Sequence, residues 1–194
     1  MNKKHLSRLW ITGVTTLFIL AFSVSTAMAE ENNCQLTLSQ STIDYGVFGQ
    51  EDVVETKNNM NVMSEKEFMV NVYCPKKQKM AVFVRGNTDA TGAFLFGNLG
   101  LIYLKVGNII VDGQPYQTGK TDDSMGFFPL KEKDNSVELY NNEGVIAVEN
   151  NIVPQGQQMS FVVTLSPFLY KDAWRRNSDQ SSLISSIEWQ ILDL

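Results

Sequence analysis

An alternation of apolar and polar residues runs through most of this chain and decides its fold class. The alternation is clear over residues 35–39 (QLTLS), 68–74 (FMVNVYC) and 187–191 (IEWQI). Successive side chains of a β-strand point to opposite faces, so a period of two predicts strands that are buried on one face. Many short strands with turn residues between them predict an all-β sandwich. Further strand-like segments are 80–84, 101–106, 109–111, 144–148 and 159–165.

Turn and loop residues separate these segments. Gly107-Asn108 predicts a turn between two strands, and Asp112-Gly113 predicts a second turn. The polar residues 75–79 (PKKQK) predict a solvated hairpin connection. Ile43, Tyr45 and Val47 continue the period of two beyond the first strand. Residues 169–186 are the one place for a short helix, although their apolar spacing is poor.

The first 29 residues have the three parts of a secretory signal peptide. Three basic residues among the first eight precede an apolar run over 10–24, and Ala27-Met28-Ala29 follows. A membrane anchor is the alternative, but the run is short for a bilayer span of ~20 residues. We therefore expect a signal peptide over 1–29 and a single exported domain over 30–194, with no transmembrane segment after cleavage.

The charge and the histidine content restrict the functions open to the mature chain. Signal cleavage leaves 13 basic against 21 acidic residues, a formal charge of −8. An acidic protein is not drawn to phosphate backbones, so we expect no nucleic-acid partner. The only histidine, His5, lies in the predicted signal peptide. Without histidine the mature chain has no Ser-His or Cys-His pair and no imidazole ligand, so we expect no enzyme activity, no catalytic residues, no metal site and no cofactor.

One segment resembles a phosphate-binding loop but departs from that motif. Residues 113–121 (GQPYQTGKT) place five residues between the glycines, where the motif requires four. Two acids, Asp122 and Asp123, follow where the helix of such a loop would begin. We therefore interpret 113–121 as a hairpin loop and the acid pair as a solvated turn.

The two cysteines, Cys34 and Cys74, predict a structural disulfide, because an even pair oxidises in an exported protein. Two free thiols or a zinc pair are the alternatives, but the spacing fits no zinc motif. A closed loop of this length stabilises the fold by ~3–4 kcal/mol in the chain-entropy model.

One cluster is a candidate partner surface, since aromatic rings beside arginines stack on sugars or anchor a protein partner. The alternative is a loop or helix that packs against the edge of the sandwich. The cluster consists of Tyr170, Trp174, Arg175 and Arg176.

Several segments resemble the subunits of chaperone-usher fimbriae. Residues 34–46 (CQLTLSQSTIDYG) resemble the opening of those subunits, which begin with a cysteine, an alternating strand and an aromatic-glycine pair. Residues 68–74, followed by 81–86 (AVFVRG), are similar to the hairpin that carries the family's second cysteine. Residues 99–106 and 152–161 are similar to later strands. The resemblance implies an immunoglobulin-like pilin β-sandwich that lacks its last strand and has one disulfide.

The resemblance also implies partners and a binding groove. A periplasmic pilus chaperone, and later a neighbouring subunit, would insert a strand into a groove, and an outer-membrane usher would assemble the fibre at the cell surface. Only residues 30–33 precede Cys34 in the mature chain, too few to donate a strand. We therefore expect a structural or tip subunit that accepts a donor strand and contributes to cell adhesion. The alternative is a self-contained secreted β-sandwich that binds, for example, carbohydrate. The expected groove residues are Leu36, Leu38, Ile187, Trp189 and Ile191.

Overall fold

Almost all secondary structure is β-strand in residues 33–130, 133–173 and 183–194, which the computed structural model describes. The described residues lie in one compact unit, residues 31–194. A short 3-10 turn, η1 (Gln50–Asp52), interrupts the strands. The larger of two sheets contains part of β4 (Lys66–Gly86) together with β1 (Gln35–Leu38), β2 (Glu55–Lys57), β3 (Met60–Val62), β5 (Phe94–Phe96), β6 (Gly100–Val111), β7 (Gln114–Pro115), β10 (Ser136–Leu139) and β12 (Gln155–Tyr170). The smaller sheet contains the rest of β4 with β8 (Gln117–Thr121), β9 (Lys133–Asp134), β11 (Gly144–Val148) and β13 (Ile187–Asp193).

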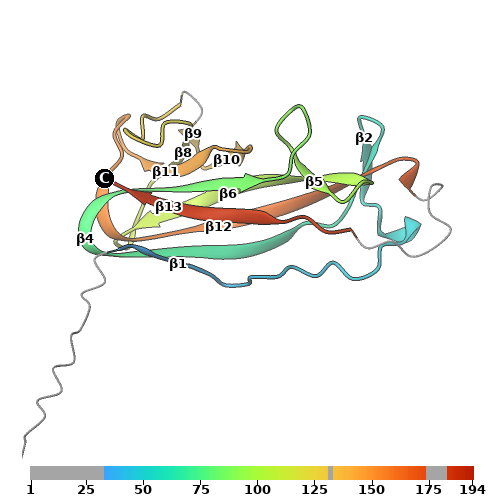
Figure 1. The fold of residues 1–194 in the computed structure, drawn as a ribbon, viewed down its shortest axis with the longest axis horizontal. Coiled ribbons are helices and arrows are strands. Elements are labelled where there is room, and N and C mark those ends of the chain that lie inside the picture. Colours follow the sequence, from blue (N-terminus) through green and yellow to red (C-terminus); the bar gives the residue numbers. More distant parts are fainter. Residues whose placement is uncertain (1–32, 131–132, 174–182) are drawn as a thin grey trace, which may run out of the picture. The chain divides into compact units, whose positions relative to one another are not determined.

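Strand β4 organises the fold because it belongs to both sheets in turn. Its first half pairs with β1 on one side and β12 on the other. Its second half pairs with β11 and β13. Figure 1 shows β4, in green, curving at one end of the fold as it passes from one sheet to the other. All of these pairings are antiparallel, and β6 and β10 extend the larger sheet beyond β12.

The inner faces of the two sheets enclose the main core. Trp189 of the smaller sheet places its ring 5.8 Å from that of Phe68 and 6.3 Å from that of Phe161, both in the larger sheet. Buried residues of β4, β6 and β12 form the rest of the same cluster. Alternating strands that bury one face against a second layer form a sandwich. The expected all-β, sandwich-like fold is confirmed.

A second, smaller core covers the outer face of the smaller sheet. Phe83 and Ile146 point away from the main core and pack with Phe127 and Val153, which lie in connecting segments. This second layer explains why β11 (GVIAV) is buried at every position, since a strand that is covered on both faces reads as a continuous apolar run.

The expectation of a hairpin around residues 75–79 was wrong. Strand β4 is continuous through this segment, and its two halves do not pair with each other but lie in different sheets. The register with β12 shifts here, because residues 74–77 of β4 stand opposite Gln157 alone, and this irregularity accommodates the bend. Lys76 and Lys77 are exposed, as a solvated connection requires.

The turn expected at Gly107-Asn108 was also wrong, because β6 is continuous from Gly100 to Val111. Asn108 has a positive φ of 55°, and the register against β12 shifts between Ser160 and Val162. The pair is therefore a β-bulge, which inserts one extra residue and bends the strand without ending it.

Three other expectations had mixed outcomes. Asp112 and Gly113, with φ of 47° and 80°, do form the turn that joins β6 to β7. Val47 is 79% exposed, so the period of two ends before it. Residues 117–121 of the expected hairpin loop are strand β8. The expected signal peptide, residues 1–29, lies outside the described residues.

Candidate functional site

Strands β1 and β13 are among the strands that have an open edge within the described part of the chain. β1 pairs with the first half of β4, and β13 pairs with the second half. The pairing pattern gives neither strand a second neighbour among the described strands. Such an edge presents main-chain N–H and C=O groups that can pair with a strand from another molecule.

The inward side chains of β1 are the two leucines expected in the groove. Leu36 and Leu38 stand opposite the buried residues Val72 and Val70 of β4. Both leucines pack against the main core but are only half-buried. Their exposed sides would be covered by a strand added beside β1.

Strand β13 has the same arrangement in the smaller sheet. Ile187, Trp189 and Ile191 pack against the main core and are half-buried. Glu188 and Gln190, which lie between them, are exposed. All five expected groove residues therefore pack against the core from two open strands, one strand from each sheet.

The predicted disulfide is confirmed. Cys34 and Cys74 are bonded and enclose a sequence separation of 40 residues. Gln78, in the segment where β4 changes sheets, donates from its amide nitrogen to Cys34 Sγ (2.6 Å) and to an Asp193 carboxylate oxygen (2.8 Å). One side chain thus connects the beginning of β1 to the end of β13. A disulfide is typical of oxidising compartments and fits an extracellular or periplasmic protein.

The candidate partner surface is only partly described. Tyr170 is the last residue of β12, is half-buried, and donates its backbone N–H to the Leu99 carbonyl. Trp174, Arg175 and Arg176 lie outside the described residues. Leu169 and Tyr170 belong to the strand, so a helix does not begin at residue 169.

Lys120, the lysine of the segment that resembles a phosphate-binding loop, has a structural role. Its side chain is 8% exposed, and its Nζ lies 3.2 Å from a Glu143 carboxylate oxygen and donates to the Glu138 carbonyl (3.1 Å). The ammonium also lies 5.3 Å from the ring centre of Tyr140. Burial and the hydrogen bond to Glu138 raise the pKa of Tyr140 to about 12. This lysine neutralises a carboxylate that packs beside the smaller sheet.

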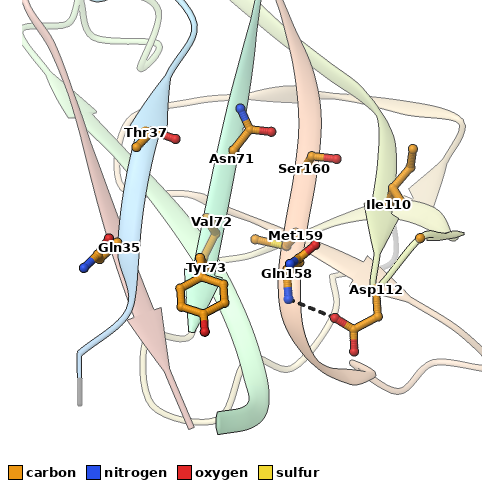
Figure 2. A pocket seen from close by; sticks show the side chains of 11 residues that line it. Gln35, Thr37, Asn71, Val72, Tyr73, Ile110, Asp112, Gln158, Met159 and Ser160 are labelled. Atoms are coloured by element: carbon orange, nitrogen blue, oxygen red, sulfur yellow. Dashed lines mark hydrogen bonds between the residues drawn. The ribbon is translucent and has the colours of Figure 1, made fainter. Parts of the chain in front are cut away.

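A shallow hollow of about 400 Å³ lies on the outer face of the larger sheet (Figure 2). We did not predict it from the sequence. Mostly exposed residues of β1, β4, β6 and β12 line it, and the Tyr73 ring lies at one border of it. The alternation does place these residues outward. Which of these residues lie side by side depends on the order and register of the strands, and the sequence of a single strand does not determine either.

Metal and membrane criteria give no further site in the described ranges. No group of three or more His, Cys, Asp or Glu residues is placed there to hold a metal ion. None of the helices in those ranges has the length and apolarity needed to cross a bilayer.

The fold and the disulfide thus define the class: an all-β, disulfide-bonded, sandwich-like protein. No protein-family model matches the chain, and no curated protein matches it.

Proposed function

We propose that the protein is a subunit of a chaperone-usher fimbria, in a structural or tip position, which accepts a donor strand and contributes to cell adhesion. The observation that carries the proposal is the pair of open edges on β1 and β13, with half-buried apolar side chains on the core side of each. A sandwich with two complete sheets would cover those side chains with its own strands.

The strand order supports the proposal. The order β1-β4-β12-β6 corresponds to strands A-B-E-D of an immunoglobulin-like sandwich. The second half of β4 and β13 then correspond to strands C and F of the other sheet, in which strand G follows F. The open edge of β13 is therefore the place of strand G, the strand that the fimbrial resemblance expects to be missing.

Strand addition explains both the affinity and the register of such a complex. Main-chain hydrogen bonds along the open edge of β13 would supply affinity. Alternate side chains of the incoming strand would pack between the inward residues of β1 and β13, among them Leu36 and Trp189, and these contacts would fix the register. In the periplasm the incoming strand belongs to a pilus chaperone, and in the fibre it belongs to another subunit delivered by the usher.

Site-specific photo-crosslinking tests this proposal. A benzophenone amino acid is placed at Ile191, which faces the core, or at Gln190, its exposed neighbour on the same strand. Each variant is co-expressed in the periplasm with a pilus chaperone encoded by the same genome. We expect a crosslink to the chaperone's edge strand from position 191 and a much weaker one from position 190.

The control position makes the outcome specific. A crosslink of equal yield from both positions, or none from either, would contradict strand addition at β13. A crosslink from position 191 to a segment of this chain that does not line the main core would indicate a sandwich that completes itself.

A further inference from the structure

The hollow on the outer face of the larger sheet is built from two rows of side chains that cross the strands. In the first row Gln35 of β1 stands opposite Tyr73 of β4, which stands opposite Gln158 of β12. Asp112, at the end of β6, closes this row and donates its backbone N–H to the Gln158 carbonyl (3.0 Å). Neighbouring strands lie ~4.8 Å apart, so the row extends ~14 Å across the sheet.

The second row lies two residues further along each strand. Thr37 stands opposite Asn71, Asn71 opposite Ser160, and Ser160 opposite Ile110. Most of these side chains are shorter than those of the first row, and this difference makes the face concave beside the Tyr73 ring (Figure 2).

The lining combines the groups that recognise sugars. Tyr73 is 50% exposed and offers an aromatic face on which the C–H groups of a pyranose ring can pack. The amides of Gln35, Asn71 and Gln158 each provide both donors and acceptors for hydroxyl groups. A solvated sheet face needs polar residues, but it needs neither a hollow nor an exposed aromatic ring beside one.

The carboxylate of Asp112 is held in a fixed position at one end of the first row. Its Oδ1 accepts hydrogen bonds from the backbone N–H groups of Gln157 and Gln158, both at 2.9 Å. These bonds, together with the charge of Lys77, hold the pKa of Asp112 below its usual value. The group is therefore ionised at neutral pH, and its second oxygen is an acceptor for sugar hydroxyls in a charge-assisted hydrogen bond.

The lining also favours one class of sugar. Asp112 is the only acidic or basic side chain among the residues that line the hollow, so the lining offers no cation to pair with the carboxylate of a sialic or uronic acid. A polypeptide that adds a strand needs an open edge, whereas the main chain of this face is already paired between β1, β4, β12 and β6.

We infer that this face binds a short neutral oligosaccharide, with Tyr73 as the stacking residue and Asp112 as the principal hydroxyl acceptor. The site lies on the outward side chains of β1 and β4, away from the inward residues proposed to receive a strand. It gives the adhesive role a receptor class, and its failure would leave the strand-accepting proposal intact.

The test is binding of the exported full chain, purified alone or with its chaperone, to an array of neutral glycans and their sialylated counterparts. Calorimetric titration with the strongest neutral glycan follows. We expect Tyr73→Ala, and separately Asp112→Asn, to weaken the affinity by about tenfold or more, the usual loss when an aromatic anchor or a charged hydrogen-bond acceptor is removed. Asparagine keeps the oxygen that accepts from Gln157 and Gln158, so the loop is preserved.

Two controls separate binding from folding. Phe128→Ala removes another exposed ring, 74% exposed and outside the hollow, and should leave the affinity unchanged. Tyr73→Phe keeps the ring and should retain most of the affinity. The inference is overturned by an array that shows no neutral glycan, by binding to sialylated glycans alone, or by an affinity that survives Tyr73→Ala.

Discussion

At the scale of single residues, Trp189 lies where the two sheets and the open edge of β13 meet. Its ring contacts Phe68 and Phe161 across the core, yet the side chain is only half-buried. A strand added at this edge would cover the indole, so Trp189 both stabilises the sandwich and reports on its completion.

Trp189→Ala should lower the free energy of unfolding by about 2–3 kcal/mol, less than the ~3–5 kcal/mol typical of a fully buried aromatic. Gln190→Ala, at the exposed neighbour, should change it by less than about 0.5 kcal/mol. Denaturant unfolding of both variants provides the measurement. Equal losses in the two variants would mean that β13 does not face the core as described.

The disulfide makes a separate contribution at this scale. Cys34→Ser or Cys74→Ser opens a loop of 40 residues and should cost ~3–4 kcal/mol of stability, with a sharp loss of periplasmic yield. The double variant should lose no more stability than either single variant, because all three lack the same bond. Unchanged melting and yield in a single variant would contradict a structural role.

Two tyrosines should control stability at high pH. Burial, with a smaller effect of Glu65, raises the pKa of Tyr45 to about 12, and the pKa of Tyr140 is raised equally far from the ordinary value of 10.0. The unfolded chain loses these protons first, so stability is fully present below about pH 10 and falls as the pH rises toward 12. Urea unfolding between pH 9 and pH 12 should show a shallower fall for Tyr45→Phe and for Tyr140→Phe. A slope equal to that of the unaltered protein would contradict the raised pKa values.

At the scale of the elements, the alternation located most strands but not their limits. Strands β1 and β13 lie where the alternation predicts them, because each is a short segment with one inward face, and β11 lies where its continuous apolar run predicts a strand. β4 and β6 were each predicted as two strands, since a polar segment and a Gly-Asn pair look the same in sequence whether they end a strand or bend it. The β2–β3 hairpin was missed, because its two-residue turn is Asn58-Asn59 and lacks the glycine of the common hairpin signals, although asparagine tolerates the positive φ that both residues adopt.

The sequence predicted only part of the candidate site, because the pairing and register of the strands cannot be deduced from single segments. The inward residues of β1 and β13 follow from the alternation, but the family resemblance was needed to place the two strands at a common gap. The sugar-binding rows depend on the register of four strands, and no single strand contains that information.

The bulge in β6 can be tested by a pair of substitutions. Asn108 is exposed and has a φ of 55°, so a substitution there acts mainly through the backbone. Asn108→Val should cost about 1–2 kcal/mol, because a β-branched residue is strained in the left-handed region. Asn108→Gly should be nearly neutral. If thermal melts showed valine to be tolerated as well as glycine, the bulge assignment would be wrong.

At the scale of the whole molecule, the proposed subunit is a sandwich that β4 and one disulfide hold together and that accepts a strand between β1 and β13. The half-buried side chains along those strands lower its stability in isolation, because apolar surface that stays in water contributes little to folding. A strand supplied by another molecule would add main-chain hydrogen bonds and cover that surface, so folding and assembly become one process.

The most direct test is to express the protein alone in an oxidising periplasm, and then with the pilus chaperone of the same genome. We predict that the protein accumulates only with the chaperone, as a one-to-one complex in which β1 and β13 are protected from hydrogen exchange. A stable, cooperatively melting monomer that accumulates alone, with no strand added at either edge, would contradict it.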